Sequence, residues 1–234
     1  MALERIKQLC ADKHIVLVGN SITALSKKQG KDIDSFDIVV RFGKGVPDPY
    51  PEYLGKRTDI WCTGNFRSEM RGYFPDKAEV LYNVASLTNV DRPSYYHTVM
   101  FDKKEIEDIQ NKYITECDTK GNKKRLSIGV MTALFFVNKV KTFSSLTFIN
   151  FDFFQKSIKM FTDVEMLANS WHLPIIVKQF AYNPDNPAHE TEAEKRVVLE
   201  LLNNDKVFFI GDVHTTKETI SQPNAPWDAL RKPI

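Results

Sequence analysis

Two ionisable residues late in the chain have the side chains that general acid–base chemistry requires. His189 follows a loop rich in proline and asparagine and opens a segment with helical hydrophobic spacing, residues 189–203. The unperturbed pKa of histidine lies near neutrality, so an imidazole at the rim of a cleft can take a proton from a hydroxyl group. Glu194 can orient His189 if the histidine precedes the first helical turn. A solvated histidine ahead of a helix is the structural alternative.

Two short turns have the composition of a phosphate-binding site. The first reads Gly-Asn-Ser at residues 19–21, between an apolar run and a helix predicted from Ile22. The second reads Ser-Ile-Gly at residues 127–129 and opens a long apolar helix. Glycine lets the backbone approach a ligand, and the free N–H groups at a helix start attract phosphate. An ordinary turn with a serine cap is the alternative at both places.

Charged residues near these turns offer further contacts. Arg41 ends a predicted strand and points either into a ligand crevice or into a buried ion pair. The basic loop at residues 120–125 is either a solvated loop or a source of positive charge for a phosphate or an anionic acceptor. Asp32 and Asp34 form a DxD pattern, which is a metal-binding alternative. These aspartates precede a strand instead of following one, so we expect no metal site.

The elements that must hold these residues alternate between short apolar runs and helical patterns. The run at residues 14–18 has no polar alternation, which is typical of a strand covered on both faces in a parallel sheet. The alternation predicts an α/β fold, a single Rossmann-like domain with a largely parallel sheet flanked by helices. The other predicted elements are strands at 36–42, 58–62, 79–85, 146–151, 174–180 and 207–210, helices at 1–12, 103–117, 128–140, 155–171 and 189–203, loops at 43–57 and 119–125, and an extended tail at 212–234, all within one domain of residues 1–234.

Composition excludes several classes of protein. The chain has 234 residues, of which 42% are hydrophobic and 26% charged, with a formal net charge of +2. This balance excludes collagen-like and disordered chains and argues against bulk binding of nucleic acid. No apolar run approaches the roughly 20 residues that span a bilayer, and the first ten residues lack a secretory hydrophobic segment. Cys10, Cys62 and Cys117 have no metal-ligand spacing. We therefore expect a cytoplasmic protein.

The first half of the chain resembles the large sialylmotif of the sialyltransferases, glycosyltransferase family 29. Residues 16–21 read VLVGNS and residues 30–42 read GKDIDSFDIVVRF. In the family, V-G-N-S is followed by G-x-x-I-D-x-x-D-x-V-x-R-x-N. The next stretch, LGKRTDI at residues 54–60, is similar to the one that follows this motif in bacterial and viral members.

Two more segments resemble family motifs in the same order. LSIG at residues 126–129, with AL at 133–134 and NFD at 150–152, is similar to the small motif S-[ST]-G, A-L and G-F-D. HETEAE at residues 189–194 fits the H-x4-E very small motif. The ordered set covers most of residues 15–195 and indicates a short bacterial or viral type of this family.

The resemblance implies a glycosyltransferase that moves a sugar from a CMP-linked donor by a metal-independent inverting displacement. It implies that His189 deprotonates the acceptor hydroxyl and that Glu194 supports it. No cofactor is expected, because the nucleotide sugar is a substrate. The residues expected at the donor nucleotide are Gly19, Asn20, Ser21, Arg41, Ser127, Ile128, Gly129 and Asn150, and those expected at the acceptor are Asn65, Tyr182, Lys123, Lys124 and Arg125; His214 is a reserve base.

Several alternatives stay open at this point. The acceptor is either a glycan or lipid-linked saccharide, or a hydroxylated base in DNA, the last as in a virus-encoded transferase with a UDP-linked donor. Gly43 replaces an asparagine of the large motif and Ile128 replaces a serine or threonine of the small motif, which leaves a nucleotide-binding module without turnover as a second class. A nicotinamide oxidoreductase is disfavoured because GxGxxG is absent. The oligomeric state is not predicted.

Overall fold

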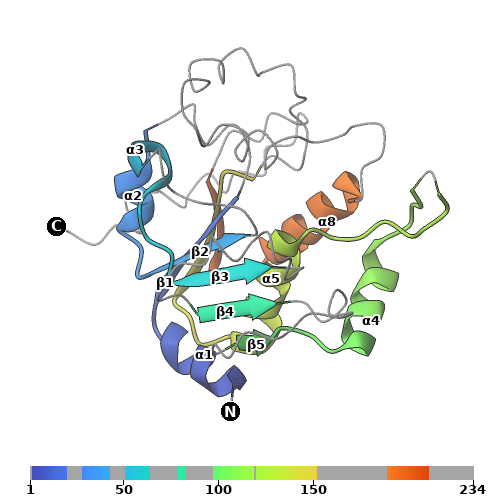
Figure 1. The fold of residues 1–234 in the computed structure, drawn as a ribbon, viewed down its shortest axis with the longest axis horizontal. Helices are drawn as coiled ribbons and strands as arrows, with labels where there is room; N and C mark the ends of the chain where they lie inside the picture. Colours follow the sequence, from blue (N-terminus) through green and yellow to red (C-terminus); the bar gives the residue numbers. More distant parts are fainter. Residues whose placement is uncertain are drawn as a thin grey trace.

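Seven parallel strands form one sheet at the centre of the fold (Figure 1). The computed structural model describes residues 2–19, 28–42, 51–63, 79–82, 97–118, 120–151 and 189–210, and the structural statements below concern these residues. The strand order is β5-β4-β3-β2-β1-β6-β7, and every neighbouring pair is parallel. The bounds are β1 His14–Val18, β2 Ile38–Phe42, β3 Ile60–Thr63, β4 Glu79–Tyr82, β5 His97–Val99, β6 Ser145–Ile149 and β7 Val207–Ile210.

Strand β1 is buried on both faces, as its uninterrupted apolar sequence predicts. Ile15 and Leu17 pack into the larger core, while Val16 and Val18 belong to a smaller core. Successive side chains of a strand point to opposite faces, so the two cores lie on opposite sides of the sheet. Fully burying one such aliphatic side chain contributes roughly 1.5–3 kcal/mol. Strand β1 is therefore held in the interior of the sheet by packing on both of its faces.

Helices cover both faces of this sheet (Figure 1). Helices α1, α4, α5 and α8 contribute residues to the larger core, whereas α2 contributes Ile33 to the smaller one. Helix α3 packs beside α2. The predicted α/β fold with a parallel sheet flanked by helices is confirmed. The bounds are α1 Ala2–Cys10, α2 Gly30–Asp34, α3 Pro51–Leu54, α4 Lys103–Tyr113, α5 Ile128–Phe135 with a π-helical turn η4 at Phe136–Val140, and α8 Thr191–Leu201.

Some predicted boundaries differ from the structure. The helix predicted over 103–117 ends at Tyr113. The Ile114 N–H still donates to the Gln110 carbonyl, but the N–H groups of Thr115 and Glu116 donate to a distant carboxylate instead of a helical carbonyl. The predicted loop at 43–57 contains the single turn of α3, and no strand was predicted where β5 lies. The strand at 174–180, the helix at 155–171 and the tail at 212–234 fall outside the described residues. The single-domain division of the chain stays a prediction.

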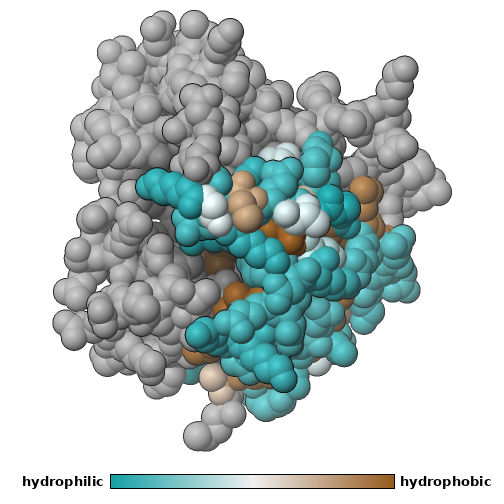
Figure 2. Space-filling model, turned by 90° about the vertical axis from the view of Figure 1, so that its right-hand side faces the viewer, coloured by the Kyte–Doolittle hydropathy of each residue, from teal (hydrophilic) through white to brown (hydrophobic). Residues whose placement is uncertain are grey.

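The surface around α4 is mostly hydrophilic (Figure 2). Figure 2 views the molecule from the right-hand side of Figure 1, and the coloured residues on that face are mostly hydrophilic, with small apolar groups between them. On this helix Lys112 pairs with Glu200 of α8 at 2.8 Å. Exposed pairs of this kind contribute about 0–1 kcal/mol, so the packing of α4 depends on its buried Ile106 and Tyr113. Within the described ranges, no helix has the length and apolar character needed to cross a membrane.

Candidate active site

The strand order of the sheet reverses between β1 and β6. The chain leads from β1 to β2 on one side and from β6 to β7 on the other. In parallel α/β sheets, ligands bind beyond the carboxyl ends of the strands at such a reversal. Gly19 follows β1 and donates its N–H to the Ile149 carbonyl of β6 at 2.8 Å. Asn150 follows β6 directly, so two residues predicted to bind the donor nucleotide meet at this point.

The glycines of the two predicted phosphate-binding turns both lie against the ring of Phe151. A Cβ atom on Gly19 would lie 2.3 Å from the Asn150 carbonyl oxygen and 2.8 Å from the ring. A Cβ atom on Gly129 would lie 2.7 Å from the same ring. Phe151 also packs edge-on against Phe42, with ring centroids 5.8 Å apart. The two turns therefore converge on one aromatic side chain, and neither has room for a side chain of its own.

A buried carboxylate ties the start of α5 to α8. Ser127 is the N-cap of α5, and its hydroxyl accepts the Val130 N–H at 3.5 Å. The N–H of Ser127 donates to Glu194 Oε1 at 2.6 Å. Glu194 belongs to the first turn of α8 and is only 1% exposed. A negative charge near a helix N-terminus is favourable because of the helix dipole. Glu194 thus fixes the helix start where Ser127, Ile128 and Gly129 are predicted to meet a phosphate.

His189 lies just ahead of α8 and is held by Arg125. The His189 Nδ1 atom is 3.1 Å from the Arg125 carbonyl oxygen, and the main chains of the two residues form a parallel bridge. The imidazole is 25% exposed. Burial lowers the pKa of His189 from 6.5 to about 4; the bond to the Arg125 carbonyl acts to raise this pKa, and the Arg125 charge acts to lower it. The ring is therefore neutral at pH 7.

This geometry defines which nitrogen of His189 can act as a base. In a neutral imidazole whose Nδ1–H donates to a carbonyl, Nε2 carries the lone pair. Glu194 Oε1 is 4.0 Å from Nδ1, beyond hydrogen-bond distance, but a carboxylate this close favours the protonated ring and so acts against burial. The Arg125 carbonyl therefore fixes the tautomer, and Glu194 contributes by placing α8 against α5. A lone pair on Nε2 is what a general base requires.

Stability is expected to depend on pH through His189. Its pKa is about 4 in the folded chain and 6.5 without burial, so between these values the unfolded chain binds more protons. The free energy of unfolding should therefore fall as the pH is lowered from 6.5 towards 4, and this component should be constant above 6.5. Urea unfolding at about pH 5 and about pH 7.5 measures this difference in the free energy of unfolding. His189→Asn should lose less stability on acidification than the wild type; equal losses would contradict the burial of the ring.

Glu190, which the sequence analysis missed, is a second buried carboxylate beside the histidine. Its side chain is 3% exposed and accepts the N–H groups of Thr115 and Glu116 at 2.8 and 3.0 Å and the Thr115 hydroxyl at 3.0 Å. Arg196 Nη2 donates to it at 3.2 Å. Burial acts to raise the pKa of Glu190, but these hydrogen bonds outweigh burial and lower it. Glu190 therefore fixes the segment after α4 next to the candidate base.

The predicted basic loop folds back on itself beside His189. Lys123 Nζ donates to Asn111 Oδ1 at 2.8 Å, and Lys124 pairs with the Glu116 carboxylate. Both amines thus have partners within the protein, which gives them a structural role alongside the predicted acceptor contact. The Arg125 residue is exposed, and it is the member of the loop that contacts the candidate base.

The sequence left two positions open for Arg41, a ligand crevice or a buried ion pair. In the structure Arg41 is buried, and its partners are backbone carbonyls. It is 2% exposed; its Nε donates to the Arg57 carbonyl at 2.9 Å and its Nη2 donates to the Leu54 carbonyl at 2.5 Å. Burial lowers the pKa of Arg41 to about 10, against the opposing effect of the Asp34 and Asp59 charges. The guanidinium is therefore charged at neutral pH and holds the turn after α3 against β2. These bonds give Arg41 a structural role, and its contact with the donor stays a prediction.

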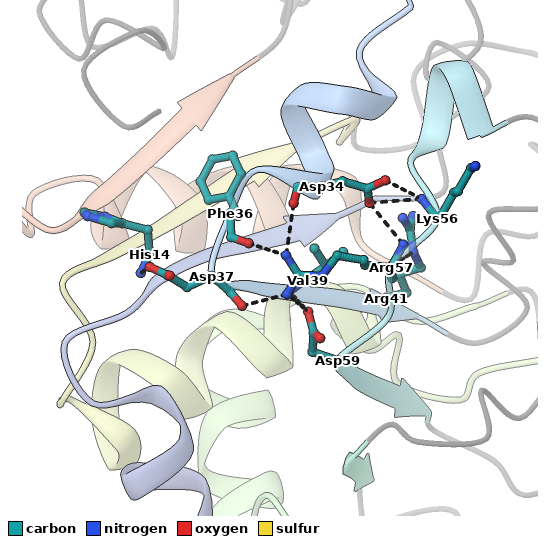
Figure 3. Close-up of polar contacts among 9 residues, drawn as sticks. All are labelled: His14, Asp34, Phe36, Asp37, Val39, Arg41, Lys56, Arg57 and Asp59. Carbon is teal, nitrogen blue, oxygen red and sulfur yellow. Dashed lines mark hydrogen bonds and ion pairs between the residues drawn. The ribbon is translucent and has the colours of Figure 1, made fainter. Parts of the chain in front are cut away.

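Arg57 links the carboxyl end of α2 to the residues that lead into β2 (Figure 3). Its guanidinium donates to the carbonyls of Asp34, Phe36 and Asp37 at 2.7 to 2.9 Å and pairs with Asp59 at 2.9 Å. Four short contacts from one side chain position the segment that resembles the stretch after the large sialylmotif. These contacts give the charged side chains of Arg57 and Asp59 partners beside the amino ends of β2 and β3.

Asp34 of the DxD pattern accepts hydrogen bonds from the loop after α3. The Asp34 carboxylate accepts the N–H groups of Lys56 and Arg57 at 2.8 to 3.0 Å, so its oxygens serve the loop (Figure 3). Across the described ranges, no three His, Cys, Asp or Glu side chains gather as a metal site would need. The predicted residues Asn20, Ser21, Asn65, Tyr182 and His214 lie outside the described residues.

Fold and site together define a class of protein. A parallel α/β sheet with two glycine turns at its strand reversal is typical of proteins that bind nucleotides. The neutral His189, just ahead of helix α8, adds a group that can take a proton from a substrate that binds beside the nucleotide.

Comparison with known proteins identifies the family. The sequence profile of glycosyltransferase family 29 (sialyltransferase) matches residues 7–157. The chain therefore belongs to this family and is a glycosyltransferase. Two crystal structures of mammalian sialyltransferases share the fold, one of them in complex with Gal-beta-1-3GalNAc-ortho-nitrophenol. The complex matches with a TM-score of 0.51 at 15% identity and the other with 0.53 at 16%; each match covers 87% of this chain and 71% of the other chain. No curated protein matches the chain by sequence.

Proposed function

We propose that the chain transfers a sugar from a CMP-linked donor to a glycan hydroxyl in one inverting displacement. The observation that carries the proposal is the neutral His189, whose Nδ1 is held by the Arg125 carbonyl at 3.1 Å. In the reaction, the acceptor oxygen forms a bond to the anomeric carbon as the bond from that carbon to the phosphate oxygen breaks. The acceptor proton passes to Nε2, and CMP leaves with the electron pair.

The start of α5 supports the departure of the phosphate. Free N–H groups at a helix start stabilise the negative charge that develops on a leaving oxygen. Gly19 and Gly129 let two backbone turns approach the same ring, which brings the turn after β1 next to this helix start. We therefore assign the donor phosphate to the N-terminus of α5. Charge stabilisation by backbone groups is consistent with transfer that needs no metal ion.

The donor itself is expected to strengthen His189 as a base. A negative charge within about 4–6 Å raises the pKa of a histidine, because it favours the protonated form. The CMP-linked donor is anionic, whereas the Arg125 charge lowers the pKa of the free ring. Binding of the donor should therefore raise the pKa of His189 from about 4 towards neutrality and strengthen the histidine as a base.

Ligand stabilisation tests the proposed donor. We expect CMP to raise the thermal midpoint in the presence of EDTA, because a ligand at about a hundred times its Kd adds about 2.7 kcal/mol to the free energy of unfolding. UDP, GDP and NAD at the same concentration should give no comparable shift. Stabilisation by UDP or GDP only in the presence of Mn²⁺ would contradict both the CMP donor and the metal-free mechanism.

A further inference from the structure

Gln29 and Asn150 form a buried pair of side-chain amides at the strand reversal. Gln29 Nε2 donates to Asn150 Oδ1 at 2.6 Å, across 121 residues of sequence. Each residue is 8% exposed. Gln29 is the N-cap of α2, yet its side chain makes no capping hydrogen bond with that helix. Its amide instead reaches the turn after β6, so the pair links the start of α2 to the predicted nucleotide site.

The other half of the Asn150 amide lacks a partner. Its Nδ2 atom is covered and makes no hydrogen bond to any described residue. Buried polar groups are almost always satisfied, because an unsatisfied one has lost its bonds to water without gaining others. The position adds to the anomaly, since Asn150 has a φ of 61°, in the left-handed region. Glycine adopts this conformation without strain, and the small sialylmotif that residues 150–152 resemble has glycine there.

The surroundings of Asn150 point to a ligand as the missing partner. Asn150 follows β6 at the point where ligands bind in sheets of this kind. Its carbonyl oxygen is the atom that a Cβ on Gly19 would meet at 2.3 Å, so it lies directly against the first glycine turn. A strained residue with an unused donor at such a place suggests a binding role.

We propose that the Gln29–Asn150 pair recognises the donor nucleotide, with Asn150 Nδ2 donating to an acceptor oxygen or nitrogen of the ligand. Gln29 is the positioning residue, because it holds the Asn150 Oδ1 atom and thereby directs Nδ2. In the free chain Nδ2 is covered, so the incoming acceptor atom replaces the atoms that cover it and supplies the bond that Nδ2 lacks. This inference rests on the proposed function, since it requires that a nucleotide binds at the strand reversal.

Calorimetric titration with CMP tests the pair. Asn150→Gly places the family's residue at a φ that suits glycine, so it should fold, and we expect its CMP affinity to be roughly three- to tenfold weaker. Asn150→Asp keeps an oxygen for Gln29 but replaces the Nδ2 donor with a second oxygen, and its affinity should fall at least as much. Gln29→Ala should weaken binding in the wild-type background and have no further effect combined with Asn150→Gly, because Gln29 acts through Asn150.

Thr147→Val is the matched control. Thr147 Oγ1 is also buried without a partner among the described residues, but it lies within β6 and not at its end. Its loss should leave CMP affinity unchanged. Titrations with cytidine and with inorganic phosphate show which part of the nucleotide Nδ2 contacts. If Asn150→Gly weakens the affinity for cytidine, Nδ2 contacts the nucleoside. If it weakens only the affinity for phosphate, Nδ2 contacts the phosphate.

The results separate this inference from the proposed function. A wild-type chain that binds CMP and an Asn150→Gly variant that binds it equally well would overturn the recognition role and leave the proposed function intact. A wild-type chain that binds no CMP would overturn the proposed function, and the inference with it. Equal weakening by Gln29→Ala in both backgrounds would show that Gln29 does not act through Asn150.

Discussion

His189→Ala should lower sugar transfer roughly 10²- to 10⁴-fold while CMP still binds. The acceptor hydroxyl loses its base, whereas the helix start at Ser127 and the turn at Gly19 are unchanged. Initial rates of product formation measure the first effect and calorimetry the second. We also expect added imidazole to restore part of the rate, because it supplies the missing nitrogen base.

The control for this variant is His14→Gln. His14 lies at the amino end of β1, where its Nδ1 is 2.8 Å from the Ser145 hydroxyl, at the edge of the sheet opposite the site. Its replacement should leave transfer unchanged. Transfer by His189→Ala at the wild-type rate would contradict the assignment of the base. Loss of CMP binding in the same variant would show that His189 belongs to the donor site instead.

Gly19→Ala should abolish CMP binding and destabilise the fold. The added Cβ would lie 2.3 Å from a backbone oxygen and 2.8 Å from a backbone carbon of Asn150, so the turns after β1 and β6 must separate. Overpacking of this kind typically costs about 1–3 kcal/mol. Urea unfolding measures the loss of stability, and calorimetry the loss of CMP affinity.

Gly121→Ala is the matched substitution on the surface. Gly121 has a φ of +78°, so alanine is strained there, but a Cβ atom would meet nothing within 4 Å. It should lose some stability and bind CMP as the wild type does. A Gly19→Ala variant with wild-type CMP affinity would contradict the placement of the nucleotide at the strand reversal.

Elements that coincide with an unbroken apolar run could be predicted from the sequence, and short elements without such a run could not. The runs at 14–18 and 207–210 match β1 and β7 in full, because each is an unbroken apolar stretch bounded by turn residues. Strand β5 has three residues and α3 has four, which is too few for a hydrophobic period to emerge. The end of α4 depends on Glu190, a contact over 75 residues, and no local pattern encodes it.

The candidate site was predictable where side chains sit in recognisable turns. Ser127 and Gly129 at a helix start, and His189 ahead of another, are local patterns, and the structure brings these helix starts together through Glu194. The choice between the two roles of Arg41 was not predictable, because it depends on carbonyls supplied by the α3 turn. The same holds for Gln29, whose partner is distant in sequence and becomes evident only when the sheet is assembled.

The central claim is metal-independent transfer from a CMP-linked sugar, and one assay tests it most directly. The wild-type chain is incubated with CMP-linked sialic acid, EDTA and a panel of glycan acceptors that includes Gal-beta-1-3GalNAc, and released CMP is measured against glycosylated product. We expect CMP release that depends on an acceptor, matches product formation and is unchanged when Mn²⁺ replaces EDTA. A rate that appears only with Mn²⁺, or product formed from a UDP-linked sugar and not from the CMP-linked one, would contradict the account.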